Sequence, residues 1–174
     1  LLIVRTERPI SDDIKRKIAL FCNVEFGAVV ESRDVGTIYE VPLRFHEQGL
    51  DEKVAQKLGL DGATPDLSQW RSVVQRVLSP HDRVRIAVVG KYTDFVDSYK
   101  SVQEALIHGG IANDVGVDIH WLSSDAFTSQ ERAADLLHGY DGLLVPGGFG
   151  VRGVEGMVAA IEYARESRLP FFGI

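Results

Sequence analysis

The second half of the chain alternates short apolar runs with segments whose apolar residues recur at helical spacing. The runs cover residues 84–90, 115–122, 140–145 and 169–174, and the helical segments lie at 97–108, 129–137 and 154–167. Regular alternation of this kind predicts a parallel sheet with right-handed crossovers. Residues 83–174 are therefore predicted to be the first part of a doubly wound α/β domain. In the first of its helices we expect Asp97 or Ser98 as the cap and Gly109-Gly110 as the end.

The first sixty residues carry strand and helix patterns at less regular spacing. We expect strands at 1–4 and 28–30, a helix capped by Ser11, and a second helix at 50–58 between Gly49 and Gly59. Residues 37–43 are expected to form a strand or an extended loop, in which Pro42 disfavours a central strand. Residues 61–82 begin with a turn-rich stretch and are predicted to be a linker with one helix, capped by Asp66.

Composition narrows the class of protein. Of the 174 residues, 45% are apolar and 25% charged, and the net charge of −6 argues against a general partner of nucleic acid or of anionic membranes. No apolar run approaches the ~20 residues of a membrane span. The single cysteine, Cys22, excludes a disulfide within the chain, suits a reducing cytoplasm and is expected to be buried. The five histidines lack metal-ligand spacing, so no metal site is predicted.

The stretch VPGGFGVRGVEG, residues 145–156, holds five glycines directly after an apolar run. Gly148, Gly150 and Gly153 spell G-x-G-x-x-G, which in a strand–turn–helix context indicates dinucleotide binding. Against that, the motif follows the third strand of its domain, and the next strand is not followed by the expected acidic residue. A plain turn is the second interpretation. A third is a backbone amide site, in which Gly147 and Gly148 donate to an oxyanion.

Two arginines of the first segment follow predicted strands, where ligands gather in α/β folds. They are Arg5 and Arg33. The adjacent pair Arg33-Asp34 can offer both a donor and an acceptor to a base edge or a ribose. A solvated surface remains the alternative for these charges.

Several long motifs together resemble the CTP synthase family. They are KIALFCN (17–23), DVGTIYEVP (34–42) with QGL (48–50), VGKY (89–92), DSYKSVQEAL (97–106) with HGG (108–110), and VPGGFGVRGVEGM (145–157). They occur in order along essentially the whole chain. The last motif distinguishes this family even among glutamine amidotransferases.

The resemblance implies an ATP-dependent amidoligase joined to a class I glutamine amidotransferase. In this family ATP phosphorylates the 4-oxygen of UTP, a Cys–His–Glu triad releases ammonia from glutamine, and the ammonia displaces the phosphate to give CTP. GTP activates glutamine hydrolysis, CTP inhibits, and the enzyme is a cytoplasmic homotetramer. The implied cofactor is ATP with Mg, whose ligands fall outside this chain, and GTP is the allosteric activator.

On this resemblance, residues 1–60 are the C-terminal part of a P-loop-type α/β amidoligase domain, 61–82 the linker, and 83–174 the N-terminal part of a flavodoxin-like amidotransferase domain. It also implies roles for individual residues. These are Gly148 as the oxyanion-hole glycine, Gly147, Gly148 and Phe149 at glutamine, Arg33, Asp34, Val35 and Arg5 at ATP, Lys17 at UTP or CTP, and Arg152 in the GTP-activator loop.

In the family, the catalytic cysteine follows directly after the residue that matches Ile174. The His and Glu partners come later, and the P-loop comes before the residue that matches Leu1. We therefore expect a fragment that is inactive alone. Two alternatives stay open from the residues, namely a catalytically dead α/β module that binds a nucleotide or a partner protein, and part of a dinucleotide-binding oxidoreductase.

Overall fold

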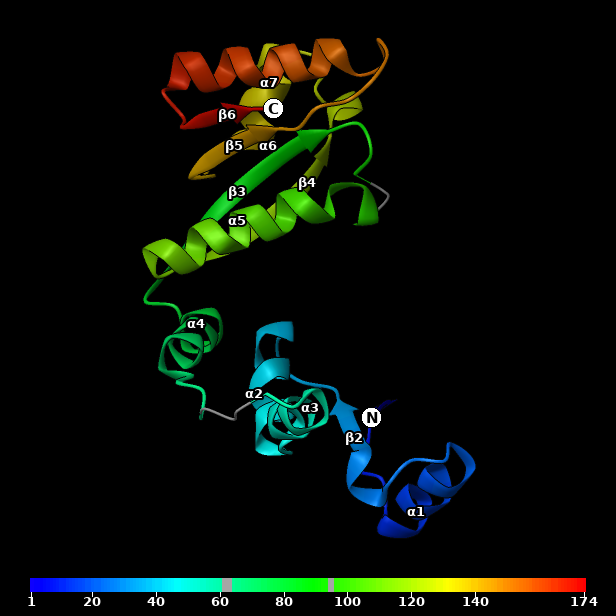
Figure 1. Ribbon diagram of the computed structural model, residues 1–174. Helices are drawn as coiled ribbons and strands as arrows, with labels where there is room; N and C mark the ends of the chain where they lie inside the picture. Colours follow the sequence, from blue (N-terminus) through cyan, green and yellow to red (C-terminus); the bar gives the residue numbers. More distant parts are fainter. Residues whose placement is uncertain (61–63, 94–95) are drawn as a thin grey trace. The chain divides into compact units, whose positions relative to one another are not determined.

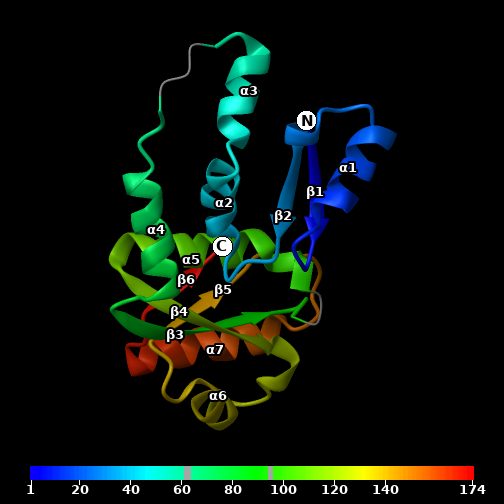
Figure 2. The ribbon, with the colours of Figure 1, turned by 90° about the horizontal axis from the view of Figure 1, so that it is seen from below.

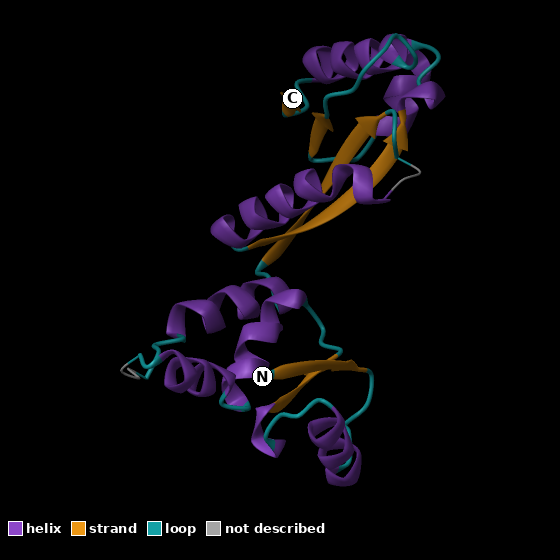
Figure 3. Cartoon of the chain, turned by 45° about the vertical axis from the view of Figure 1, so that its right-hand side comes forward, coloured by secondary structure: helices purple, strands orange, loops and turns teal. Residues whose placement is uncertain are grey.

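The computed structural model describes residues 1–60, 64–93 and 96–174 of the chain (Figure 1). These residues form two compact units, Leu1–Leu78 and Ser79–Ile174. Residues 61–63, with which the expected linker begins, lie outside the described residues. Each unit has its own parallel sheet, visible as orange strands in Figure 3.

The first unit is a two-stranded parallel sheet with helices. Its elements in chain order are β1 (Leu2–Thr6), α1 (Asp12–Phe21), the 3-10 turn η1 (Phe26–Ala28), β2 (Val29–Arg33), the 3-10 turn η2 (Ile38–Glu40), α2 (Val41–Glu47), α3 (Leu50–Leu58) and α4 (Ser68–Leu78). Strands β1 and β2 lie side by side, with Arg5 opposite Ser32 and Thr6 opposite Arg33 (Figure 2). Both strands therefore end at the same edge of the sheet.

The helix signals of the first unit are confirmed where they are local. The Ser11 hydroxyl accepts from Ile14 N at 3.4 Å and caps α1, and Gly49 and Gly59 flank α3 in left-handed backbone conformations. The expectation of a strand or loop at 37–43 is wrong. Pro42 lies in the first turn of α2, where a proline needs no N–H partner and its fixed φ suits the helix.

Helix α4 belongs to the first unit. Trp70 Nε1 donates to Tyr39 O at 2.8 Å, and the two rings lie 6.3 Å apart. Asp66 accepts from Ser68 N at 2.9 Å just before the helix, as its pattern predicts. Residues 64–78 are thus structurally part of the first unit, although they follow the segment that matches the amidoligase pattern.

The second unit is a doubly wound parallel sheet, which confirms the predicted fold class. Its elements are β3 (Asp82–Gly90), η3 (Val96–Tyr99), α5 (Lys100–Asn113), β4 (Val115–Ser123), η4 (Ser124–Ala126), α6 (Gln130–Leu137), β5 (Gly142–Val145), α7 (Val154–Ser167) and β6 (Phe171–Gly173). The strand order is β4-β3-β5-β6, and all three pairings are parallel. This is the order of the flavodoxin-like fold as far as its fourth strand.

Helices cover both faces of this sheet. Figures 1 and 2 show α5 on one face and α6 and α7 on the other. Alternate strand residues point to the α6–α7 side, where the main core forms. That core comprises Ala87, Val89, Phe127, Ala133, Leu137, Leu143, Val145, Met157, Ala160 and Ala164.

The expected limits of α5 are wrong at both ends. The helix begins at Lys100 after the 3-10 turn, without a side-chain cap, and it continues through Gly109-Gly110 to Asn113. Gly110 is buried, and a Cβ there would lie 2.5 Å from Val115 O. The glycine therefore permits close packing of the helix on the chain entering β4, rather than ending the helix.

Cys22 is exposed, so its expected burial is wrong. It is the residue that follows the last turn of α1, whose buried residue is Ala19. The neighbouring Leu20 and Phe21 are also exposed. An apolar neighbourhood in sequence is therefore no guide to burial at this helix end.

Among the described residues, no helix has the length and apolar character that crossing a membrane requires. The described residues also contain no cluster of three His, Cys, Asp or Glu side chains that could hold a metal ion.

Candidate functional sites

The glycine-rich stretch lies at the carboxyl end of the parallel sheet. It leaves β5 after Val145 and runs to α7, the orange loop in Figure 1. Its neighbour β3 leads to α5 on one face, whereas β5 leads to α7 on the other. The loop therefore starts at the topological switch point, where ligands bind in folds of this kind.

The first two glycines of the loop lie beside the end of β6. Ile174 N donates to Val145 O at 3.0 Å, and a Cβ on Gly147 would lie 3.5 Å from Ile174 O. Within the described part of the chain, neither the Gly147 N–H nor the Gly148 N–H donates a hydrogen bond. These amides can serve an anionic or carbonyl oxygen of a ligand, and no Cβ blocks its approach.

Lys91 lies under the loop. It follows the last residue of β3, and only 8% of it is exposed. Its ammonium donates to Phe149 O at 3.3 Å and to Gly150 O. Its aliphatic stem lies under Gly148, whose Cβ, if present, would be 3.3 Å from Lys91 Cδ.

Arg152 closes the same arrangement from the loop side. Its Nη2 donates to Lys91 O at 2.9 Å. The Lys91 ammonium therefore holds the loop backbone at Phe149 and Gly150, and the Arg152 guanidinium holds the backbone of Lys91. In contrast, Phe149, whose backbone oxygen accepts from Lys91, is 93% exposed.

Packing accounts for the last glycines of the stretch. Gly153 has φ +71° and precedes α7, and a Cβ there would overlap the buried Ser124 hydroxyl. A Cβ on Gly156 would overlap Ser124 O. These glycines let α7 approach η4, so the third glycine of G-x-G-x-x-G has a steric role. The third glycine of a dinucleotide-binding loop has the same packing role, so it is the loop's place after the third strand of its sheet that disfavours the dinucleotide interpretation.

In the first unit, the predicted ATP residues converge on one cavity. Arg5, Arg33, Asp34 and Val35 line a cavity of about 490 Å³ at the ends of β1 and β2, with Ser32, Ile38 and Val41. Arg5 forms an ion pair with Asp34, although both side chains are more than half exposed. The cavity thus combines an apolar wall with a guanidinium–carboxylate pair.

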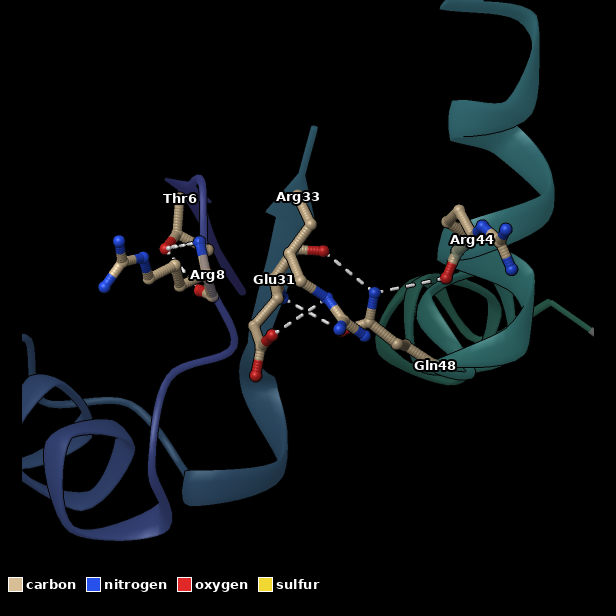
Figure 4. A network of polar contacts seen from close by, with 6 residues as sticks. All are labelled: Thr6, Arg8, Glu31, Arg33, Arg44 and Gln48. Atoms are coloured by element: carbon tan, nitrogen blue, oxygen red, sulfur yellow. Dashed lines mark hydrogen bonds and ion pairs between the residues drawn. The ribbon is translucent and has the colours of Figure 1, made fainter. Parts of the chain in front are cut away.

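A second cavity of about 680 Å³ shares Arg33, Asp34 and Val35 and is lined mostly by charged residues. Gln48 lies at its edge and binds the free side of β2 (Figure 4). Its Oε1 accepts from Glu31 N at 2.9 Å, and its Nε2 donates to Glu31 O at 2.8 Å and to Arg44 O at 3.1 Å. Arg33 Nε lies 3.3 Å from Glu31 Oε2. The Gln48 amide therefore holds the strand from which Arg33 projects.

Among the predicted site residues of the first unit, Lys17 lines neither cavity. It is exposed on α1, and its neighbours Lys15 and Arg16 lie over the Phe26 ring. Lys91 and Gln48, in contrast, are residues that sequence reasoning missed. Both stand inside quoted motifs, and the argument used for Arg5 and Arg33, a polar residue directly after a buried strand, also points to Lys91.

The fold and the loop together indicate the class of protein. A doubly wound sheet with free backbone amides at its switch point is suited to acyl-transfer chemistry. The family model described as glutamine amidotransferase class-I matches residues 94–174, and the model described as CTP synthase N-terminus matches residues 1–60.

Individual relatives agree with this pair of matches. The CTP synthase of Oleidesulfovibrio alaskensis is 52% identical over 174 residues, which are 100% of this chain and 32% of that protein. The CTP synthase of Methanocaldococcus jannaschii is 52% identical over 180 residues, covering 100% of this chain and 33% of that protein. The chain belongs to the CTP synthase family, and it spans about a third of the length of these relatives.

One solved structure is also similar. It is the Trypanosoma brucei CTPS glutaminase domain with bound acivicin, which is 45% identical, covers 52% of this chain and 35% of that chain, and has a TM-score of 0.48.

Proposed function

We propose that the chain is part of a glutamine-hydrolysing ligase that makes CTP from UTP in pyrimidine nucleotide biosynthesis. The observation that carries the proposal is the placement of the Gly147 and Gly148 amides beside the end of β6, at the switch point of the sheet. That is where an acyl-transfer site needs its oxyanion donors, next to a nucleophile carried by the following strand.

In the second unit, Gly148 N–H donates to the oxyanion that forms when a thiolate attacks the glutamine amide. Gly147 and Phe149 complete the glutamine contact. The resemblance puts the nucleophilic cysteine directly after Ile174, with its His and Glu partners further on. On this proposal the 174 residues by themselves hydrolyse no glutamine and form no CTP.

In the first unit, the cavity at the ends of β1 and β2 binds ATP. Val35 contributes to the apolar wall for the base, and Arg33 and Asp34 offer a donor and an acceptor, while Arg5 holds Asp34. This fits a nucleoside, which needs one apolar face and a few polar contacts. We assign no Mg ligand to the described residues. The Mg ion would be held by ligands outside these residues and would neutralise charge on the phosphates.

The remaining assignments are proposed from the resemblance of these residues to the family's motifs. Lys17 contacts the triphosphate of UTP or CTP as a compact positive charge. The complete protein is a homotetramer in the cytoplasm. Arg152 belongs to the loop through which GTP activates glutamine hydrolysis, and CTP inhibits by feedback. For Lys17→Ala, we expect a raised UTP requirement with either nitrogen source.

The division of labour can be tested in the complete protein with Gly148→Pro. Proline removes the proposed donor N–H, so glutamine-dependent CTP formation should fall about 10²–10³-fold. Ammonia-dependent CTP formation should remain. Both rates are measured as CTP produced with glutamine or with ammonium chloride.

Gly109→Ala is the control, because it changes a glycine of α5 outside the site, where an added Cβ meets no atom within 4 Å. It should retain the glutamine-dependent rate. Equal loss of both activities in Gly148→Pro would contradict the proposed oxyanion role.

A further inference from the structure

Lys91 is a buried cation that the proposed chemistry does not use. A buried ammonium is unfavourable unless it is partnered by hydrogen bonds. Here its partners are the backbone oxygens of Phe149 and Gly150, both in the loop that carries the proposed glutamine contacts. Hydrogen bonds to this loop therefore replace the hydrogen bonds to water that the ammonium loses on burial.

These two contacts fix the orientation of two peptide groups. In a trans peptide the C=O and N–H point in opposite directions, and the described residues contain no cis peptide. With the Phe149 and Gly150 oxygens drawn to Lys91, the N–H groups of Gly150 and Val151 must face away from it. Without the ammonium these peptides lose their hydrogen-bond anchor, and packing does not replace it at Gly150, where an added Cβ would meet no atom within 4 Å.

Lys91 itself is fixed from three sides. Arg152 Nη2 donates to its backbone oxygen at 2.9 Å. Its stem supports Gly148. The preceding Gly90 is packed so tightly that a Cβ there would lie 2.8 Å from the Tyr99 hydroxyl and 3.2 Å from Pro146 Cγ. The lysine is thus rigidly placed by β3, and it transfers that rigidity to a loop that is otherwise outside the sheet.

We propose that Lys91 is a positioning residue of the glutamine site, whose ammonium anchors the two peptides after Phe149 and thereby the far side of the short turn that carries the Gly148 N–H. The inference rests on the proposed function. Lys91 contacts the loop and acts through it, so its loss should lower kcat for glutamine more than it raises KM. A displacement of about 1 Å in such a donor can reduce the rate about 10²-fold.

The test uses the complete protein with Lys91→Met, which keeps most of the stem and removes the ammonium. We expect glutamine-dependent kcat to fall about tenfold to a hundredfold, with ammonia-dependent CTP formation within twofold of the wild type. Hydrogen exchange at 147–152, measured by mass spectrometry, should become faster. Arg165→Met, which removes an exposed positive charge from α7, is the control and should change neither quantity.

Circular dichroism establishes whether Lys91→Met is folded. If it is not, Lys91→Arg decides, because it keeps a charged donor and should then retain glutamine-dependent activity and slow exchange in the loop. A folded Lys91→Met protein with unchanged glutamine-dependent kcat, or with equal loss of both activities, would overturn the inference. So would a folded Lys91→Arg protein that loses both.

The two proposals fail in distinguishable ways. If Gly148→Pro separates the two nitrogen sources and Lys91→Met does not, the oxyanion assignment stands and only the role of Lys91 is wrong. If Gly148→Pro does not separate them, the proposed function is wrong, whatever Lys91→Met does.

Discussion

The two candidate sites are held in place in different ways. The two cavities of the first unit that share Arg33 are bordered by charged side chains, most of them exposed, and the larger of the two also by the Gln48 amide; all of these reach their partners through flexible side chains. The loop of the second unit is fixed by a buried lysine and by glycines that let α7 pack directly on η4. One arrangement depends on polar contacts in solvent, whereas the other depends on close packing.

This difference indicates how each site responds to change. Exposed ion pairs are individually weak and tolerate substitution. Close-packed interiors do not, because one added methyl group forces the backbone to move. The three predictions that follow, in order of decreasing effect, test whether that contrast is real.

The largest effect is expected at Gly156. In Gly156→Ala the new Cβ overlaps Ser124 O, which is backbone and cannot rotate away. We expect a loss of about 3 kcal/mol in the stability of the second unit, measured by hydrogen exchange of the peptides in α6 and α7 in the complete protein. Gly109→Ala is the control, because a Cβ there has open space and alanine favours helix by up to about 1 kcal/mol. Similar behaviour of the two variants would refute the steric role of Gly156.

An intermediate effect is expected at Gln48. In Gln48→Glu the carboxylate can still accept from Glu31 N, but it cannot donate to Glu31 O or Arg44 O. We expect a local loss of about 1–3 kcal/mol, seen as faster exchange in β2, together with a raised apparent KM for ATP. Gln56→Glu makes the same charge change on the exposed side of α3 and should leave both unchanged. An unaltered β2 in Gln48→Glu would show that the amide does not support the strand.

The smallest effect is expected at Asp51, at the start of α3. The hydrogen bond from His46, 2.6 Å away, lowers the pKa of Asp51. A lowered pKa means that the ionised carboxylate stabilises the fold above its unfolded pKa of about 4, and that this contribution is lost as the pH falls through the lower folded value. Because the side chain is 37% exposed, Asp51→Asn should destabilise by less than about 1 kcal/mol at pH 7, and the difference should disappear as the pH falls through the folded pKa.

Urea unfolding at a series of pH values measures this difference. A difference for Asp51→Asn that grows toward low pH would have the wrong sign for the proposed cause.

The sequence predicted the second unit well because its signals are local and periodic. Helices α6 and α7 lie where expected, since the spacing of their apolar residues depends on neighbours within a few residues. The errors lie where distant packing decides. The pair Gly109-Gly110 predicts a helix end, but α5 continues past it, and Gly110 packs against Val115 O. Pro42 is similar, because a proline marks a helix start only once the following residues are known to be helical.

The sites were predictable to the extent that strand ends reveal them. Arg5 and Arg33 lie in the last two residues of β1 and β2, Asp34 and Val35 follow β2, and the structure brings all four together. The roles of Lys91 and Gln48 were not predictable, because each depends on backbone groups far along the chain, 58 residues away for Phe149 and 17 for Glu31. No pattern of residue types encodes a hydrogen bond to a distant carbonyl.

The strand order has a consequence for synthesis. The central pairing of the second unit joins β3 to β5. Val88 of β3 pairs with Trp121 on one side and with Leu144 on the other, and Leu144 is synthesised later than Trp121. On a ribosome that adds about 5–20 residues per second, one edge of β3 is left open for seconds. Open apolar edges attract other strands. The nascent chain is therefore most prone to misassembly after β4 has emerged and before β5 has. In the folded unit this edge of β3 is covered by β5.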